Sequence, residues 1–186
     1  MRIVGGRYRN RPIVAPKGRS TRPTSDRARE NLFNVLEHAG WAPAIDGARV
    51  IDLYAGSGAL GLEAMSRGAG FCLFVEMAAE ARGAIRNNID TLQLFGVTRL
   101  HRRDATALGE KPSNLGAPFN LVFLDPPYGH GLGEKTLARL IEGGWVSEHA
   151  GAVLEVGADE DPVTPGWERQ AVKEYGAAKV LFLTRG

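Results

Sequence analysis

From residue 46 onward, short apolar runs alternate with longer segments in which apolar residues recur every three or four positions. The apolar runs predict strands at 49–54, 71–76, 98–104, 118–125 and 151–157. The periodic segments predict helices at 59–68, 77–95 and 134–145. Strands that alternate with helices predict βαβ units, and therefore a mostly parallel sheet with helices on both faces. Runs as apolar as LVFL, at 121–124, are typical of strands that are buried on both faces.

The end of the chain departs from this alternation. Residues 167–176 and 178–185 are two strand-like segments, and the first of them ends in a glycine. They predict a final pair of antiparallel strands, which brings the expected sheet to seven strands. We therefore expect a Rossmann-like α/β fold, with a seven-stranded, mostly parallel sheet and an antiparallel C-terminal strand.

The N-terminal segment forms a separate unit in the pattern. Short β-like runs at 2–4 and 12–14 predict a small hairpin, which leads into a loop and then a helix at 25–39. Thr24 or Ser25 can cap the start of this helix. We therefore divide the chain into a basic arm over residues 1–24 and the main α/β domain over residues 25–186.

Charge separates this N-terminal region from the rest of the chain. The 186 residues are 44% apolar, which is enough for one domain with a sizeable core. The net charge is only +2, but residues 1–30 carry nine Arg or Lys against Asp26 and Glu30, a net charge of +7. The remainder therefore has a net charge of −5. This asymmetry favours a polyanionic partner such as nucleic acid, although a solvated charged surface has the same composition.

The composition also bears on the cellular compartment. The single cysteine, Cys72, cannot form an internal disulfide, which fits a reducing compartment. No apolar stretch approaches the roughly 20 residues of a membrane span, and the sequence MRIVGGRYRN lacks the apolar run of a signal peptide. The histidines show no metal-ligand spacing with one another or with Cys72. We expect a cytoplasmic protein without a membrane partner or a metal.

The sequence VIDLYAGSGALGLEA, at 50–64, follows a predicted strand and opens a predicted helix. Its glycines Gly56, Gly58 and Gly61 match the GxGxxG nucleotide-binding pattern. Glu76 lies 20 residues after Gly56, at the end of the next strand, where a carboxylate can bind ribose hydroxyls. The pattern alone is compatible with a dinucleotide, with S-adenosylmethionine or with a tight turn that binds nothing.

Asp52 helps to decide between these ligands, because it lies at the end of the strand that precedes the glycines. A pyrophosphate at a helix N-terminus favours positive potential, which a buried carboxylate would oppose. S-adenosylmethionine has no phosphate, and its ammonium group can be stabilised by a carboxylate. We therefore expect S-adenosylmethionine as the cofactor. Asp104, after the third strand, either accepts a hydrogen bond from the adenine or caps a helix.

The segment VFLDPPYGHG, at 122–131, places Asp125 at the carboxyl end of a strand, where open α/β sheets bind ligands. Pro126 and Pro127 have no N–H and a fixed φ, so their carbonyls can face a cleft. Asp125 and the Pro126 carbonyl can accept both hydrogens of an exocyclic base amine, and Asp125 can then receive the departing proton. Tyr128 can hold the extruded base by stacking. The alternative is a chance turn.

With these motifs the chain resembles the RsmD family of class I S-adenosylmethionine-dependent methyltransferases, which methylate guanine N2 in small-subunit (16S) ribosomal RNA. The resemblance rests on MRIVGGRYRNRPIVAP, TRPTSDRARENLFNVL, VIDLYAGSGALGLEAMSRGA and NLVFLDPPYG. The second segment is the most family-specific, because generic methyltransferases lack it. The resemblance implies a substrate RNA in assembled or assembling 30S particles, with ribosomal proteins as further contacts.

The resemblance also implies roles for individual residues. The catalytic cleft would be formed by Asp125, Pro126, Pro127 and Tyr128. The cofactor would be bound by Asp52, Tyr54, Ala55, Gly56, Ser57, Gly58, Glu76, Asp104 and Ala105. The N-terminal hairpin and loop would help to hold RNA through Arg22 and Arg27, placed near the cleft, and through Arg7, Arg9 and Arg19.

Three other functions share part of this pattern. A DNA adenine-N6 or cytosine-N4 methyltransferase has the same motifs, but a separate target-recognition domain does not fit within this length. A nicotinamide-dependent oxidoreductase could use the loop at 56–61, although Asp52 and the DPPY segment argue against it. A non-catalytic RNA-binding module would not require an intact catalytic constellation.

Overall fold

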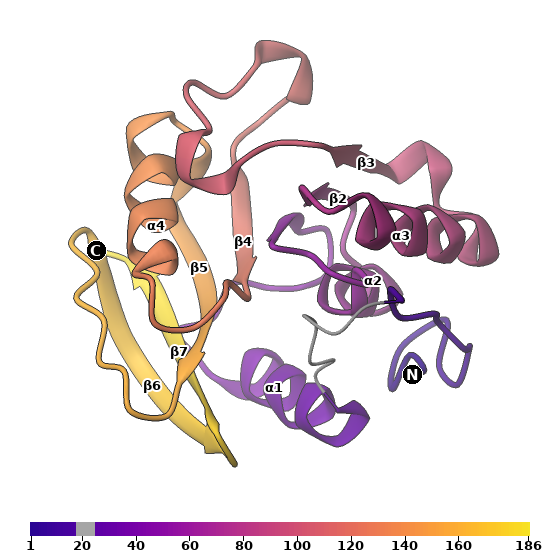
Figure 1. Cartoon of the computed structure of the whole chain (residues 1–186), viewed down its shortest axis with the longest axis horizontal. Coiled ribbons are helices and arrows are strands. Elements are labelled where there is room, and N and C mark those ends of the chain that lie inside the picture. Colours follow the sequence, from indigo (N-terminus) through magenta and orange to yellow (C-terminus); the bar gives the residue numbers. More distant parts are fainter. Residues whose placement is uncertain (18–24) are drawn as a thin grey trace.

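The computed structural model describes residues 1–17 and 25–186; the predicted RNA contacts Arg19 and Arg22 lie outside these ranges. One seven-stranded sheet has the strand order β3-β2-β1-β4-β5-β7-β6 (Figure 1). Strands β1 to β5 are parallel to their neighbours in that group, and β7 is antiparallel to both β5 and β6. The predicted seven-stranded sheet is thus confirmed. The strands are β1 (Arg49–Leu53), β2 (Phe71–Val75), β3 (Thr98–His101), β4 (Phe119–Leu124), β5 (Val146–Gly157), β6 (Trp167–Tyr175) and β7 (Ala178–Arg185).

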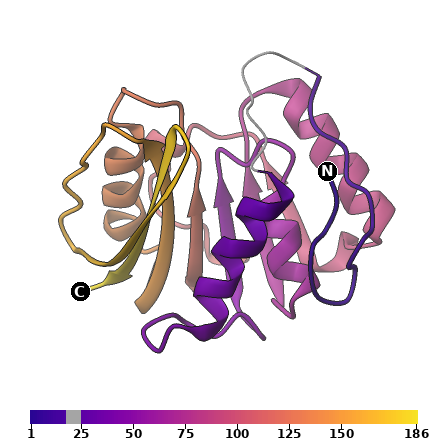
Figure 2. The same cartoon turned by 90° about the horizontal axis from the view of Figure 1, so that it is seen from below.

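Helices cover both faces of the sheet (Figure 2). Helices α1, α2 and α3 contribute to the core on one face, whereas α4 and the 3-10 helix η2 contribute to the core on the other face. Ser25 begins α1 as predicted, because its Oγ accepts a hydrogen bond from the Ala28 N–H at 3.0 Å. The helices are α1 (Asp26–His38), α2 (Ala59–Ser66), α3 (Ala79–Leu92), α4 (Leu132–Glu142), η1 (Phe95–Val97), η2 (Ala105–Ala107) and η3 (Ser113–Leu115).

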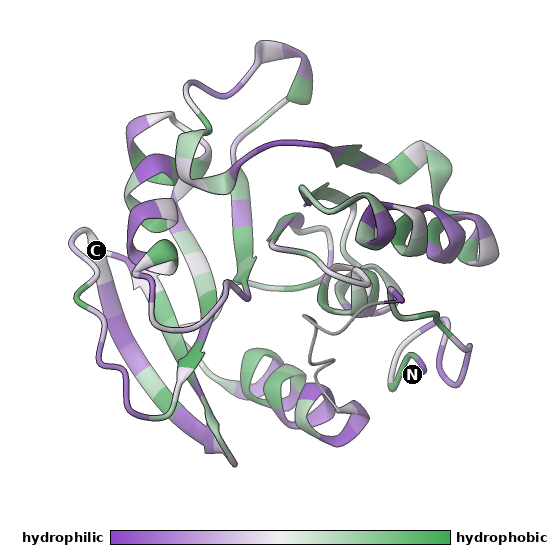
Figure 3. Cartoon of the chain, viewed as in Figure 1, coloured by the Kyte–Doolittle hydropathy of each residue, from purple (hydrophilic) through white to green (hydrophobic). Residues whose placement is uncertain are grey.

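Strand β4 shows how the sequence produces these layers. Successive side chains of a strand point to opposite faces. Leu121 and Phe123 therefore pack in the core beside α1, α2 and α3, and Val122 and Leu124 pack in the core beside α4. The outermost strand β6 is largely hydrophilic (Figure 3), as expected for an edge strand with one face in solvent. No helix within the described ranges is long and apolar enough to span a membrane.

The N-terminal segment packs on helices rather than extending the sheet. The predicted hairpin closes with a single β-bridge, between Arg2 and Pro12, and its apolar residues Ile3 and Ile13 are buried. Three backbone hydrogen bonds join its two arms, and several other N–H groups pair with the helices. The Asn88 side chain of α3 accepts from the Val14 N–H at 2.8 Å and donates to the Val14 carbonyl at 3.0 Å. Partners on the helices therefore complete the hydrogen bonding of a short strand ladder.

A buried group of charges fixes the same segment to α1 and α2. The Arg29 and Glu63 side chains have no solvent exposure, and Arg29 Nε lies 3.1 Å from Glu63 Oε1. Arg67 Nε donates to the other Glu63 oxygen at 2.9 Å. Glu63 also accepts hydrogen bonds from the Val4 and Gly5 N–H groups, at 3.0 and 2.9 Å. Every partner of Glu63 is charged or a backbone N–H donor, so these contacts compensate the buried carboxylate for the water that it loses on folding.

Candidate active site

The carboxyl ends of β1 and β4 open into a cavity of about 470 Å³. It lies at the point where the strand order reverses, which is the usual ligand site of open α/β sheets. Segments that follow three different strands meet here, together with the end of the N-terminal segment. Of the predicted site residues, the cavity brings together Asp52, Tyr54, Ala55, Gly56, Ser57, Glu76, Asp125, Pro126, Pro127 and Tyr128.

The loop after β1 holds an unusual backbone path. Tyr54, Gly56 and Gly58 all have positive φ, at 56°, 59° and 79°. Glycine adopts such angles without strain, whereas Tyr54 needs support from its surroundings. The Tyr54 hydroxyl lies 2.8 Å from Thr136 Oγ1 on α4, which anchors the side chain. Gly58 serves as the N-cap of α2 and does not line the cavity.

Glu76 and Asp52 tie this loop to the strand ends. Glu76 follows β2, and its two carboxylate oxygens accept from the Gly56 and Ala78 N–H groups, each at 2.8 Å. Asp52 Oδ2 accepts from the Gly61 N–H at 3.0 Å. Gly61 is confined by close packing, because a Cβ there would lie 2.6 Å from the Phe74 ring. The glycine pattern therefore serves both turn geometry and helix packing.

Asp52 is a buried carboxyl group in the cavity wall. Burial raises its pKa from 3.8 to about 8, the Gly61 N–H opposes that rise, and the nearby Glu76 charge adds to it. The thiol of Cys72 lies close to Gly61 and is buried too; burial and the neighbouring Asp52 raise its pKa. A cationic ligand beside Asp52 would favour its ionised form, whereas a phosphate would not. The buried carboxyl group in the cavity wall therefore fits S-adenosylmethionine better than a dinucleotide.

The DPPY segment continues directly from β4. The Asp125 N–H donates to the Leu53 carbonyl at 3.4 Å, so the segment begins beside the end of β1. The Tyr128 hydroxyl donates to Glu155 Oε2 at 2.6 Å, and the Gly129 N–H donates to Glu160 at 3.1 Å. These bonds hold the segment against the end of β5 and the loop that follows it.

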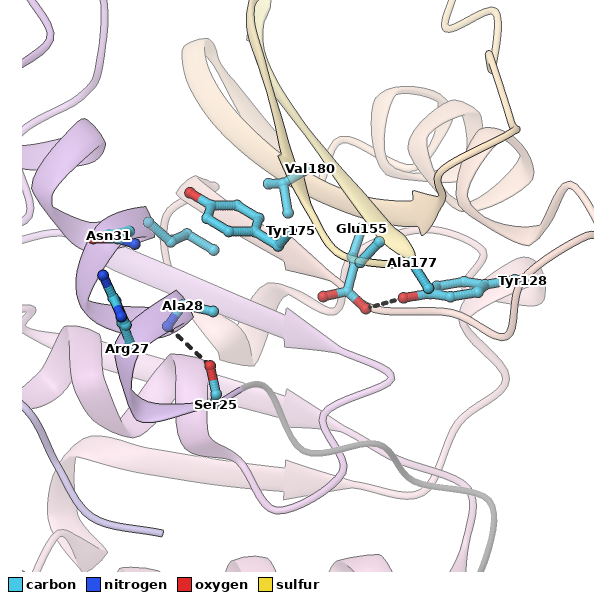
Figure 4. A pocket seen from close by; sticks show the side chains of 11 residues that line it. Ser25, Arg27, Ala28, Asn31, Tyr128, Glu155, Tyr175, Ala177 and Val180 are labelled. Atoms are coloured by element: carbon cyan, nitrogen blue, oxygen red, sulfur yellow. Dashed lines mark hydrogen bonds between the residues drawn. The ribbon is translucent and has the colours of Figure 1, made fainter.

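A second cavity, of about 380 Å³, adjoins the first. Figure 4 shows Arg27 and Asn31 of α1 on one side of it, and Tyr128, Glu155 and Tyr175 on the other. Tyr128 and Glu155 line both cavities, so they stand between the cofactor side and this neighbouring space. Glu155 was not among the predicted site residues. Its signal in the sequence is a lone carboxylate inside the apolar run GAVLEVG.

Other predicted site residues lie outside both cavities. Asp104 caps η2, where its Oδ1 accepts from the Thr106 N–H at 2.9 Å and from the Thr106 hydroxyl at 2.7 Å. These bonds lower the pKa of Asp104. Ala105 is buried in η2, and the contact of Asp104 with adenine remains a prediction. Arg7 and Arg9 are exposed on the N-terminal turn. Within residues 1–17 and 25–186, no group of three His, Cys, Asp or Glu could hold a metal ion.

Comparison with known proteins identifies relatives over nearly the whole chain. The family model described as Conserved hypothetical protein 95 matches residues 1–184. The ribosomal RNA small subunit methyltransferase D of Escherichia coli (strain K12) is 39% identical over 150 residues, covering 81% of this chain and 71% of that one. The putative rRNA methyltransferase YlbH of Bacillus subtilis (strain 168) is 39% identical over 128 residues, covering 69% and 67%.

Solved structures agree with this similarity. The putative methyltransferase yhhF from Escherichia coli superposes with a TM-score of 0.85 and 37% identity, covering 100% of this chain and 97% of that one. A putative RNA methyltransferase, PH1948 from Pyrococcus horikoshii, has a TM-score of 0.70 over 93% of this chain and 90% of that one. At 17% identity, the second likeness concerns the fold alone.

Proposed function

The chain belongs to the RsmD family of methyltransferases, and from this premise we propose that it methylates the exocyclic N2 amine of a guanine in small-subunit (16S) ribosomal RNA, with S-adenosylmethionine as methyl donor. One observation carries the proposal: residues 54–57 of the glycine loop and the whole DPPY segment line a single cavity at the carboxyl edge of the sheet. The class I methyltransferase fold is established by the sheet and by the solved relatives.

The cofactor side of the cavity is assigned to the segments after β1 and β2. Asp52 would pair with the ammonium group, the backbone at Gly56 would approach the methionine part closely, and Glu76 would accept from the ribose hydroxyls. When bound, S-adenosylmethionine supplies a methyl group on a positively charged sulfur. Glu76 already receives two backbone N–H groups, so its orientation is fixed before any ligand arrives.

The substrate side is assigned to the DPPY segment. Asp125 and the Pro126 carbonyl would accept the two hydrogens of the base amine, which fixes the nitrogen and directs its lone pair towards the cofactor side. Asp125 would then take the proton that the nitrogen loses. Tyr128 would stack on the base, which must leave its own stack to reach the cavity.

The raised pKa of Asp52 gives a testable pH dependence. Below a pKa of about 8 the free protein holds Asp52 protonated, whereas a bound ammonium favours the carboxylate. Binding should therefore release a proton, and the affinity for S-adenosylmethionine should fall from about pH 7.5 to 6 by up to about tenfold per pH unit. Calorimetry in two buffers of different ionisation enthalpy measures that proton directly. Asp52→Asn should abolish both the proton release and the slope, and a slope unchanged in that variant would contradict this assignment.

Arg27 is the described arginine best placed to hold RNA. It is exposed in the first turn of α1 and lines the second cavity, opposite Tyr128. Replacing one phosphate-binding arginine removes about one counterion-release contact. Arg27→Ala should therefore make the negative slope of log affinity against log salt shallower by about 0.7. Affinity for methyl-deficient small-subunit particles, measured at several salt concentrations, tests this. Arg86→Ala, an exposed arginine on α3, is the matched control and should leave the slope unchanged.

The substrate is proposed to be RNA in assembled or assembling 30S particles, with ribosomal proteins contributing contacts and the cytoplasm as the compartment.

Incubation with labelled S-adenosylmethionine and either methyl-deficient small subunits or duplex DNA tests the substrate class. Mapping of modified nucleosides in ribosomal RNA from cells with and without the gene then identifies the base. Incorporation into DNA only would replace this proposal by the DNA methyltransferase, and stabilisation by NADH rather than S-adenosylhomocysteine would favour the oxidoreductase.

A further inference from the structure

Glu155 occupies a position equivalent to that of Asp125 on the next strand. Strands β4 and β5 are parallel and paired in register up to Leu124 and Leu154. Asp125 and Glu155 each come one residue later, so the two carboxylates leave neighbouring strands at the same level. Val153, two residues before Glu155, packs in the core beside α1, which places Glu155 on that face of the sheet as well.

Glu155 also separates the two cavities. One of its carboxylate oxygens accepts from the Tyr128 hydroxyl at 2.6 Å. Figure 4 shows the other oxygen turned away from Tyr128, towards the α1 side of the second cavity. A base that stacked on Tyr128 with its amine at Asp125 would have its adjoining edge close to Glu155.

We propose that Glu155 selects guanine by accepting a hydrogen bond from N1–H of the target base, while Asp125 and the Pro126 carbonyl hold the N2 amine. This assignment rests on the proposed function and adds a specificity-determining residue to it. Neighbouring strands lie about 4.8 Å apart, so side chains that leave them at the same level can reach one base edge. In guanine, N1–H and the N2 amine are such donors, and flipped bases are read on this edge.

The same carboxylate would reject the other amino-bearing bases. In adenine and cytosine the exocyclic amine adjoins a ring nitrogen that has a lone pair and no hydrogen. An ionised carboxylate only accepts hydrogen bonds, so it would face that lone pair without a donor. A site built for a donor discriminates strongly against an analogue without it, because its acceptor is left unpaired. A carboxylate at this position would thus favour guanine-N2 transfer over adenine-N6 and cytosine-N4 transfer.

The test uses a base analogue that lacks both the N1 hydrogen and the 6-oxygen of guanine, and the Glu155 variant isolates the contribution of N1. 2-Aminopurine keeps the 2-amine but has no hydrogen on N1. Methyl-deficient small-subunit particles carrying either guanine or 2-aminopurine at the methylated position are compared by kcat/KM, and the fluorescence of 2-aminopurine reports binding separately. The wild-type enzyme should prefer guanine by at least about 100-fold. In Glu155→Gln the amide can donate to the N1 lone pair, so the preference should fall to within about tenfold.

The control variant is Glu174→Gln, which alters an exposed glutamate on β6 outside both cavities and should keep the wild-type preference. Both variants should bind S-adenosylhomocysteine as the wild type does, which verifies that they fold. Equal use of both bases by the wild-type enzyme, or an undiminished preference in Glu155→Gln, would overturn the role of Glu155 while leaving methyl transfer to guanine intact. Failure of the wild-type enzyme to methylate the guanine particles would instead refute the proposed function, and this assignment with it.

Discussion

Replacement of Asp125 by alanine should lower kcat for methyl transfer by about 10²–10⁴-fold. The affinity for S-adenosylmethionine should change by less than about threefold, because Asp125 would act mainly in the transition state. The variant loses both an acceptor that holds the amine and the group that takes its proton. Single-turnover transfer to methyl-deficient small-subunit particles, combined with calorimetric binding of the cofactor, separates the two effects.

Two further variants sharpen this test. Asp125→Asn keeps one acceptor oxygen but is a far weaker proton acceptor, so its rate should lie between those of the wild type and the alanine variant. Asp90→Ala changes an exposed aspartate on α3 and should leave the rate unchanged. A near-normal rate for Asp125→Ala would contradict the mechanism, even if RNA binding were confirmed.

The second large effect concerns stability. Arg29→Ala should lower the free energy of unfolding by about 3–5 kcal/mol, because it removes one partner from a buried ion pair and leaves Glu63 with less compensation. It also removes the hydrogen bond from Arg29 to the Arg2 carbonyl, which joins α1 to the N-terminal segment. Equilibrium unfolding in urea measures the loss, with the m-value checked for constancy.

The matched control for Arg29 is again Arg86→Ala, whose exposed side chain should contribute less than about 0.5 kcal/mol. A second comparison is Glu63→Gln, which keeps the shape of the side chain but weakens the interaction with both Arg29 and Arg67. It should also destabilise the protein. A loss below about 1 kcal/mol for Arg29→Ala would mean that water or a neighbouring residue replaces the guanidinium.

The positions of the parallel strands along the chain could be predicted from the sequence, because burial on both faces leaves nearly continuous apolar runs. Strand β4 and the apolar part of β5 are the clearest examples. The start of β5 was missed: Val146 begins the strand, five residues before the predicted start, since Ser147, Glu148 and His149 interrupt the apolar pattern. Pairing with β4, including an irregularity near Phe119, sets this boundary, and no local pattern encodes it.

The candidate site could be predicted where a motif lies on a single strand end. The loop after β1 and the DPPY segment can each be recognised within a few residues, and the fold brings residues of both to one cavity; their chemical roles stay predictions. Glu155 and Asn88 act through partners 27 and 74 residues away in the chain. Such contacts arise from tertiary packing, so the sequence around each residue carries little sign of them.

The single cysteine provides the protein with an internal reporter of unfolding. Cys72 lies on β2, an inner strand of the sheet, and has no exposed surface. Its pKa is also raised, so a thiol reagent has neither access nor thiolate to attack in the native state. Alkylation should therefore proceed only through opening of the sheet. Conversely, a cysteine introduced on the surface would be the sole labelling position, and a fluorophore attached near α1 could follow the approach of RNA without competing modification.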